Sequence, residues 1–470
     1  VSFIYKSHRI YEGKDPLPGL PSTFCGDVKA QTLELIAEDS SAGVEAVLKY
    51  SVFEDCDAVI RSVQIKNTSK EKVQLLKCMS VCIDMDNDDY ELLSLHGSWA
   101  RERHIQRRKI GYGTSSVSSV RGVSSQQEHP FIALVNSYTT QTHGNALGMS
   151  FIYSGNFYAG VSVNQFNSAR VMMGIHPSDF CWNLESGSVF TSPEAVLVYS
   201  DQGLGGMTRI FHDLFRNHLI RGMYKDVKRP ILINNWEATY FDFNTDKLLA
   251  IAREAAQNGI EMLVMDDGWF GKRNTDDVSL GDWVVNEDKL AGGLPFLVDE
   301  VNKLGLKFGL WVEPEMVSPD SDVYRAHPDW AISVPSRKPA LSRNQYVLDF
   351  TRTDVADYIY ESIKKVLKSA NIEYIKWDMN RALSDIGSAA LDSESQGELF
   401  HRYVLGLYAV QERLVREFPY ILLENCSSGG ARFDPGMLYY SPQIWCSDDT
   451  DAIERLAIQE GTALVYPLSS

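Results

Sequence analysis

Acidic side chains stand at the ends of short apolar runs in the second half of the chain. Asp378 directly follows the run at 374–377, and Asp448 follows the run that contains Ile444. Two carboxylates in different electrostatic settings can divide nucleophilic attack and proton transfer between them, and that division of labour cleaves glycosidic bonds. These two residues therefore predict a glycoside-cleaving site.

The run before Asp378 also carries a basic residue. In an extended strand alternate side chains share a face, so Lys376 and Asp378 are expected to point the same way. A nearby ammonium group lowers the pKa of a carboxyl, and an ionised carboxylate is what a nucleophile requires. A purely structural ion pair uses the same spacing, so the pattern alone leaves both interpretations open.

The run before Asp448 has a different character. Alternation places Ile444, Cys446 and Asp448 on one face and Trp445 on the opposite face. A carboxyl beside apolar and acidic neighbours suits a general acid. The pattern therefore predicts the acid at Asp448 and the nucleophile at Asp378.

Other strand ends are acidic or aromatic as well. A single acidic residue at a strand end often caps the next helix, but capping explains the whole set poorly. The further acidic residues are Glu237, Asp266, Asp267, Glu313, Glu315, Asp349 and Asp449.

Tryptophans at the strand ends can form platforms for the apolar faces of a sugar ring. We expect Trp236 and Trp311 to line the site, and Trp269 and Trp377 to pack in the core.

A repeating order of elements positions these residues. After residue 230 short apolar runs alternate with helical patterns, which predicts a (β/α)₈ TIM barrel whose strand ends form one mouth. The expected strands are 231–237, 262–270, 307–315, 346–350, 374–381, 421–430, 443–451 and 463–470. The expected helices begin at Thr245 and at 296, 355 and 399, and they end at Gly259 and at 304, 367 and 418.

The front of the chain differs from the back. Apolar and polar residues alternate in short runs there, with turn-rich stretches between them, which predicts a β-sandwich. We therefore expect a β-sandwich at 1–200, a helical connector at 201–229 and the barrel at 230–470.

Composition excludes several function classes. The chain has 470 residues and a net charge of −17, which argues against a nucleic-acid partner. The sequence contains no apolar run long enough for a membrane span. Its 7 cysteines lack CxxC spacing and its 10 histidines show no metal-binding pattern, so we expect a cytoplasmic protein without metal or cofactor.

The chain begins at Val1 and stops within an apolar run, so we expect both ends to be truncated. A signal peptide before Val1 therefore stays open.

At these motifs the chain resembles the family 36 glycoside hydrolases, the α-galactosidases of bacterial type. The resemblance covers nearly the whole chain. The matching stretches are WARERH (99–104), YSDQGLGGMTR (199–209), NNWEATYFDF (234–243), DDGWFGKR (266–273), LGDWVVN (280–286), GLWVEPEMVSPDSD (309–322), HPDWAI (327–332), LSRNQYVLDF (341–350), YIKWDMNR (374–381), ENCSSGGARFDPGMLYYSPQIW (424–445) and SDDTDAIERL (447–456).

The resemblance implies a retaining double displacement on terminal α-galactosyl residues of oligosaccharides such as melibiose and raffinose. Asp378 would be the nucleophile and Asp448 the acid/base. It also implies a homotetramer, and sandwich strands and a C-terminal β-domain beyond the ends of this chain. The substrate-binding residues that it implies are Trp99, Trp236, Asp266, Asp267, Trp311, Arg343, Lys376, Asn380, Cys426, Gly429 and Trp445.

Several alternatives stay open. Ser428 and Ala431 stand where many relatives have glycine, so an α-N-acetylgalactosaminidase remains open, as does a galactosyltransferase of the same family. From another class, Asp266, Glu313 and Asp349 could hold Mg²⁺ as in enolase-type barrels. A non-catalytic sugar-binding protein is a further alternative.

Overall fold

Strands dominate the N-terminal part of the computed structural model, which describes residues 1–470. A ten-stranded antiparallel sheet has the order β1-β2-β3-β4-β16-β11-β10-β7-β8, with β15 beside β4. Its strands are β1 (Ile4–Glu12), β2 (Ala30–Asp39), β3 (Val44–Phe53), β4 (Cys56–Asn67), β7 (Glu91–His96), β8 (His104–Lys109), β10 (Glu128–Val135), β11 (Ala146–Phe151), β15 (Val189–Thr191) and β16 (Ala195–Ser200).

Smaller sheets complete this part. One has the order β12-β13-β6, and another pairs β14 with β5. These strands are β5 (Val73–Leu75), β6 (Met79–Met85), β12 (Phe157–Val163), β13 (Ala169–Ile175) and β14 (Trp182–Leu184), and β9 (Gly113–Ser119) lies beside β12. Apolar side chains such as Phe131, Phe151 and Phe157 are fully buried here. Strand β10 has seven consecutive buried residues, so it is covered on both faces.

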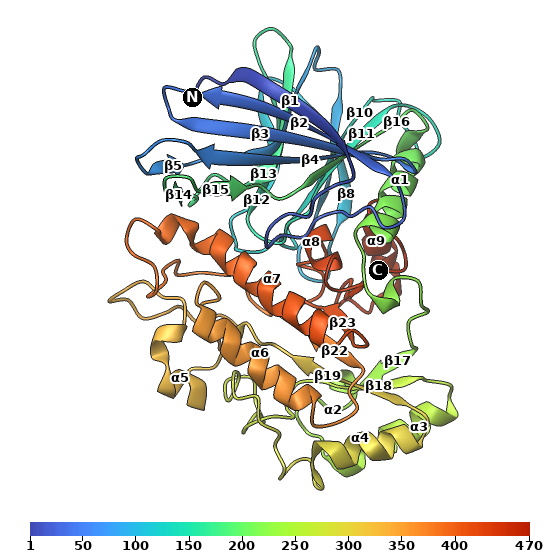
Figure 1. Ribbon diagram of the computed structural model, residues 1–470. Coiled ribbons are helices and arrows are strands. Elements are labelled where there is room, and N and C mark those ends of the chain that lie inside the picture. Colours follow the sequence, from blue (N-terminus) through green and yellow to red (C-terminus); the bar gives the residue numbers. More distant parts are fainter.

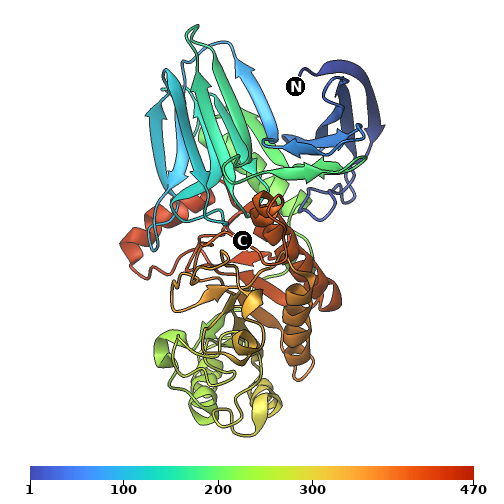
Figure 2. The same ribbon diagram turned by 90° about the vertical axis from the view of Figure 1, so that its left-hand side faces the viewer.

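The second half is built on six parallel strands in the order β17-β18-β19-β22-β23-β24. These strands are β17 (Leu232–Asn234), β18 (Met262–Met265), β19 (Lys307–Val312), β22 (Tyr374–Trp377), β23 (Leu422–Asn425) and β24 (Gln443–Ile444). Their spatial order is their chain order, so their carboxyl ends share one edge. Figures 1 and 2 show this half below the N-terminal strands.

Helices separate the parallel strands. The long ones are α3 (Thr245–Gln257), α4 (Gly293–Lys303), α6 (Thr353–Leu367) and α7 (Leu399–Glu417). The cap of α3 is Asn244 rather than Thr245, because the Asn244 side chain accepts a hydrogen bond from the Lys247 backbone N–H. The short elements are η1 (Met223–Lys225), α2 (Trp236–Thr239), α5 (Asp322–Ala326), η2 (Pro328–Trp330), η3 (Gln396–Glu398) and α8 (Pro435–Leu438).

Two expected barrel strands are not part of the parallel sheet. The run at 346–350 forms only the two-residue strand β21 (Tyr346–Val347), which pairs antiparallel with β20 (Met316–Val317). The run at 463–470 is not a strand: it follows α9 (Ala452–Ala463) as a series of turns. Its apolar side chains, Val465 and Tyr466, are buried without a strand partner, and the Tyr466 hydroxyl is 2.6 Å from Nε2 of His129 in the N-terminal half.

One hydrophobic core of 109 buried residues runs through both halves. Helix α1 (Gly203–His218) joins them and lies against β4, β11 and β16. Its buried residues Met207, Phe211 and Leu214 face that sheet, and the carbonyl oxygen of Leu464 accepts a hydrogen bond from the Thr208 hydroxyl at 2.8 Å. None of the helices is both long enough and apolar enough to cross a lipid bilayer.

Candidate active site

Asp378 lies directly after β22 and is surrounded by donors. Its Oδ2 accepts hydrogen bonds from the Trp311 indole at 3.0 Å and from the Asn380 amide at 2.9 Å. Its Oδ1 accepts from the Met379 backbone N–H at 2.9 Å. The side chain is buried, so both of its oxygens have fixed partners and a fixed orientation.

The electrostatic setting of Asp378 favours its ionised form. Burial alone would raise the pKa of Asp378, but the Lys376 ammonium and the bonds from Trp311 and Asn380 outweigh burial and hold that pKa below its ordinary value. Burial would lower the pKa of Lys376, and the carboxylate of Asp266, 3.1 Å away, raises it well above its ordinary value. The strand therefore carries a charged lysine beside a charged aspartate, as the alternation of β22 predicts.

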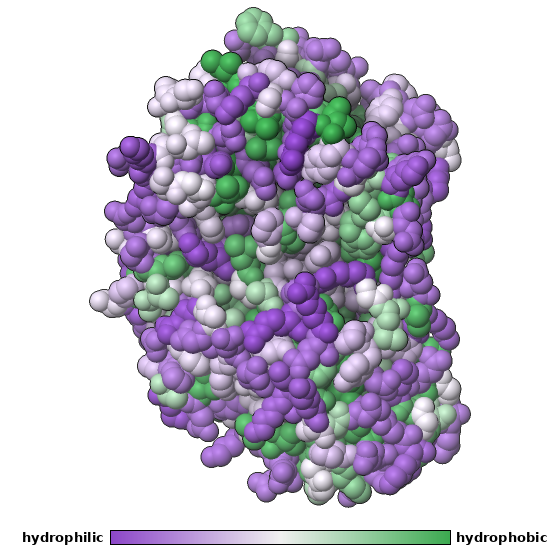
Figure 3. Space-filling model, viewed as in Figure 1, coloured by the Kyte–Doolittle hydropathy of each residue, from purple (hydrophilic) through white to green (hydrophobic).

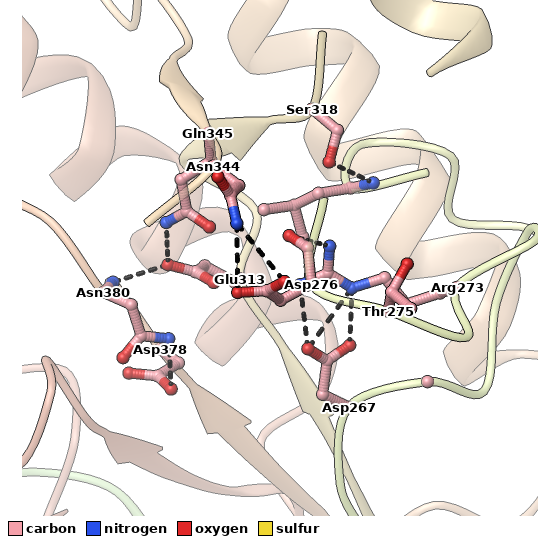
Figure 4. A network of polar contacts seen from close by, with 12 residues as sticks. Asp267, Arg273, Thr275, Asp276, Glu313, Ser318, Asn344, Gln345, Asp378 and Asn380 are labelled. Carbon is pink, nitrogen blue, oxygen red and sulfur yellow. Dashed lines mark hydrogen bonds and ion pairs between the residues drawn. The ribbon is translucent and has the colours of Figure 1, made fainter. Parts of the chain in front are cut away.

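Glu313, which follows β19, is a neighbour of Asp378. The sequence places it among the acidic strand ends and in the metal alternative, but not among the predicted catalytic or substrate-binding residues. Its Oε1 accepts from the Gln345 amide at 2.7 Å and from the Asn380 backbone N–H. Burial and the charge of Asp378 raise the pKa of Glu313 to about 7. Figure 4 shows Asp378, Asn380, Glu313 and Gln345 joined by these contacts. Asn380 thus binds both Glu313, whose pKa is raised, and Asp378, whose pKa is lowered.

Asp448 has a different environment. It follows β24, is exposed, and accepts hydrogen bonds from two indole N–H groups: Trp445 at 2.8 Å on Oδ1 and Trp99 at 3.0 Å on Oδ2. Trp99 lies between β7 and β8, so the N-terminal half contributes to this site. The prediction that Trp445 faces away from Asp448 is wrong, because β24 ends at Ile444 and strand alternation does not continue beyond it.

Asp266 and Asp267 follow β18 and are both buried. Oδ2 of Asp266 accepts from the Asn234 amide at 2.5 Å as well as from Lys376. Asp267 forms an ion pair with the buried Arg273, 2.9 Å between Oδ2 and Nη2, which Figure 4 shows opposite Asp378. Burial raises the pKa of Asp267, and Arg273 opposes that shift. Arg273 has no distinguishing spacing in the sequence, so sequence reasoning missed it.

Cys426 and Gly429 lie in the loop after β23. Burial raises the pKa of the Cys426 thiol well above its ordinary value, and the charge of Asp378 raises that pKa further. The charge of Asp448 raises this pKa further, and the Lys376 ammonium opposes both carboxylates. Gly429 has φ +80°, and a Cβ there would lie 2.6 Å from Oε1 of Glu102 and 2.9 Å from the backbone nitrogen of Asp448. A side chain at this position would therefore displace Asp448 or Glu102.

Two predicted residues do not join these contacts. Arg343 is exposed in the turn that follows Ser342, and its side chain forms no hydrogen bond or ion pair. Trp236 begins α2, where its ring packs edge-on against Tyr240 and Phe241, with centroids 5.2 and 5.1 Å away. Its indole lies at the rim of the strand ends without a polar partner.

The remaining tryptophans separate as expected. Trp269 and Trp377 are fully buried, and their indoles donate to the Trp311 carbonyl and to Glu315, each at 2.8 Å. Trp311 is also buried, but its indole reaches Asp378.

A cavity of about 160 Å³ opens beside Asn380, between the two halves of the molecule. The N-terminal half contributes the segment around Gln126, whose amide donates to the Ser428 carbonyl. The Ser428 hydroxyl in turn donates to Oδ1 of Asn380 at 3.0 Å. The cavity is lined by Arg121, Val123, Ser125, Gln126, Gln127, Met379, Asn380, Arg381, Ala382, Ser427, Ser428 and Ala431.

The three carboxylates of the metal alternative have separate partners. Asp266 is bound to Lys376, Glu313 to Asn380 and Gln345, and Asp349 to Thr351 and Ser388. No three His, Cys, Asp or Glu side chains of the chain gather in a geometry suited to a metal ion. The arrangement does not support an enolase-type site.

Comparisons with known proteins agree with this fold. Residues 1–185 match the glycosyl hydrolase family 36 N-terminal domain, and residues 189–470 match the Melibiase family. The chain is 54% identical over 467 residues to alpha-galactosidase AgaA of Geobacillus stearothermophilus, and 50% identical over 466 residues to alpha-galactosidase Mel36A of Lactobacillus acidophilus. Each match covers 99% of this chain but 64% of the relative.

Solved structures give the same result. The chain is similar to crystal structures of AgaA, with a TM-score of 0.97, 53% identity, and coverage of 99% of this chain and 65% of that one. Variants of AgaA with the same TM-score are described in complex with stachyose and with raffinose. The galactosidase domain of AgaSK has a TM-score of 0.96 at 48% identity, with 99% of this chain and 64% of that one covered.

These matches confirm the fold class that the sequence predicts, a β-sandwich followed by a catalytic domain of barrel type. They span nearly all of this chain and about two thirds of its relatives' length. The chain therefore belongs to glycosyl hydrolase family 36, with a Melibiase catalytic region behind the N-terminal domain of that family.

Proposed function

We propose that the protein is a retaining exo-α-galactosidase. The observation that carries the proposal is the contrast between its two carboxylates. Asp378 is buried and kept ionised by Lys376, as a nucleophile requires, whereas Asp448 is exposed at the rim, as a group that exchanges protons with leaving group and water requires. The names of the relatives, which are alpha-galactosidases, support the same activity.

The reaction would proceed in two displacements. In the first, a carboxylate oxygen of Asp378 bonds to the anomeric carbon, the glycosidic C–O bond breaks, and Asp448 gives its proton to the departing oxygen. In the second, Asp448 takes a proton from water, the hydroxide oxygen bonds to the anomeric carbon, and Asp378 leaves as a carboxylate. The three hydrogen bonds to Asp378 fix it in position for both steps.

The other site residues would bind the galactosyl unit. Asp266 and Asp267 would accept bonds from sugar hydroxyls, and Lys376 would donate one. Trp99, Trp236 and Trp445 would supply aromatic surface near the rim, and Arg343 would reach the sugar from its exposed turn. Oligosaccharides of the raffinose type are the proposed substrates, since AgaA structures are described with raffinose and stachyose.

We also propose that the protein is a homo-oligomer, a tetramer as its resemblance to the family implies. Light scattering of the purified chain would give its oligomeric state, and a monomer at micromolar concentration would contradict this association.

We also propose a cytoplasmic location. All 7 cysteines are free, which supports that location.

The activity is tested by release of 4-nitrophenol from 4-nitrophenyl α-galactoside. We expect turnover by the folded chain and a loss of at least about 10⁴-fold in Asp378→Ala. The folded chain failing to hydrolyse the substrate, or Asp378→Ala retaining full turnover, would overturn the proposal. The matching α-N-acetylgalactosaminide, tested side by side, separates the two hydrolase specificities. Turnover that survives a chelator would exclude the metal alternative.

A further inference from the structure

The loop between β7 and β8 carries a buried carboxylate with an unusual set of partners. Glu102 has an exposed fraction of 0%. Its Oε2 accepts a hydrogen bond from the Ser447 hydroxyl at 2.6 Å, and its Oε1 accepts from the Gly430 backbone N–H at 3.3 Å. Ser447 immediately precedes Asp448, and Gly430 follows Gly429, so Glu102 connects the two loops that form one side of the site.

Stability does not explain a charge at this position. Burying a carboxylate is costly unless it is paired with a cation, and Glu102 forms no ion pair. Arg103, its neighbour, uses its guanidinium for the Gly430 carbonyl at 2.9 Å and the Thr462 hydroxyl at 2.7 Å. The Glu102 carboxyl therefore has neutral donors as its hydrogen-bond partners.

The backbone around this loop is packed too closely for a side chain at two of its glycines. A Cβ on Gly430 would lie 2.3 Å from the Cys446 carbonyl oxygen, and one on Gly97 would lie 1.9 Å from the Arg101 carbonyl oxygen. Ala100 and Arg103 adopt φ values of +58° and +57°, a region that residues other than glycine rarely occupy. Such strain persists only where the surrounding structure holds it, and it clusters at functional sites.

We propose that Glu102 is a positioning residue for the acid/base Asp448. Glu102 binds the Ser447 hydroxyl from the buried side, while Trp99, three residues earlier in the same loop, binds the Asp448 carboxylate from the exposed side. The N-terminal half would thereby set where the proton donor stands relative to the departing oxygen. This inference rests on the proposed function, in which Asp448 is the proton donor.

A misplaced proton donor has a recognisable kinetic effect. A sugar leaving group needs protonation as the glycosidic bond breaks, whereas 4-nitrophenolate is a good leaving group without it. A change that displaces only the donor therefore lowers kcat/KM for raffinose more than for 4-nitrophenyl α-galactoside. A general loss of folded enzyme lowers both by the same factor.

The experiment compares kcat/KM on these two substrates for variants of Glu102 and Ser447, together with two control variants. We expect Glu102→Ala to lower the raffinose value by about 10- to 100-fold and the aryl value by less than about threefold. Ser447→Ala, which removes the hydroxyl that binds Glu102 and is the smaller change, is expected to act in the same direction. Glu102→Gln keeps an oxygen toward Ser447 and is expected to restore the wild-type ratio within about threefold.

Glu194→Ala is the matched control. Glu194 is also a buried carboxylate of the N-terminal half, 1% exposed, and it binds Thr23 and Lys14 far from the strand ends. It should alter stability without altering the ratio of the two substrates. Equal losses on both substrates in Glu102→Ala and Ser447→Ala, or no loss in either, would overturn the positioning role. An unchanged ratio in Asp448→Asn would instead count against the proposed function, because Asp448 would then not be the proton donor.

Discussion

At the scale of single residues, the Lys376 ammonium and the hydrogen bonds from Trp311 and Asn380 together hold the pKa of Asp378 below its ordinary value. Glu313 and Asp267 are equally buried, and their pKa values are raised, whereas the pKa of Asp378 is lowered. Alternation along β22 is sufficient to predict this pair from the sequence. It fails for Trp445 and Asp448, because the strand that would carry the alternation ends before them.

Removing that charge should move the pH dependence of activity. In Lys376→Met the pKa of Asp378 rises, because burial is no longer opposed by the ammonium group. In the proposed mechanism Asp378 must be ionised to attack, so the acidic limb of the kcat/KM profile should shift to higher pH. The measurement is a pH profile with 4-nitrophenyl α-galactoside from pH 4 to 9.

Lys289→Met is the control for that profile. Lys289 is a second partly buried lysine near the site, but its ammonium binds the carbonyl oxygens of Phe241 and Gly268 rather than a carboxylate. It is expected to leave the acidic limb in place even if it lowers the rate. A limb that stays fixed in Lys376→Met, or that moves equally in both variants, would show that Lys376 does not govern the ionisation of Asp378.

At the scale of elements, the sequence predicts strands well where they are covered on both faces. The six strands of the parallel sheet lie within the expected runs, since each is short, apolar and followed by a helix. The runs at 346–350 and 463–470 have the same composition but different partners: an antiparallel two-residue strand in one case, and the N-terminal half in the other. Local pattern cannot distinguish burial in a sheet from burial against another part of the chain.

The short helix α8 offers a test of how the two halves are joined. Asp434 caps it through the Met437 backbone N–H, and the hydroxyls of Ser124 and Ser154, both from the N-terminal half, donate to the same carboxyl at 2.7 and 2.6 Å. Burial raises the pKa of Asp434 to about 6. The folded protein therefore keeps a proton here that the unfolded chain releases near pH 4.

Because the folded pKa is the higher one, this group makes the free energy of unfolding fall as pH rises from about 4 to 6. The contribution is at most about 3 kcal/mol, and it does not change further above pH 6. Asp434→Asn cannot titrate but keeps one oxygen for Met437 and Ser154, so its stability should decline less over that range. Urea denaturation at pH 4, 5, 6 and 7 measures both slopes, and parallel slopes for the two proteins would contradict the assignment.

At the scale of the whole molecule, the two halves share their interior. The second family match begins at residue 189, yet β15 and β16 beyond that point belong to the large N-terminal sheet. Hydrophilic side chains cover much of the second half on the face shown in Figure 3. Buried polar contacts cross between the two halves. In one of them the Tyr153 hydroxyl oxygen lies 2.9 Å from Nδ1 of His401.

A shared interior should make unfolding cooperative across the chain. Chains of this length usually unfold domain by domain, because the contacts between their domains are weak. Here the continuous core, the Asp434 contacts and the Glu102 loop all have to break before either half can unfold alone. We expect calorimetry to show one transition whose van't Hoff and calorimetric enthalpies agree. Two resolved transitions would mean that the halves are stable separately, and a fragment covering 201–470 would then fold and show heat absorption of its own.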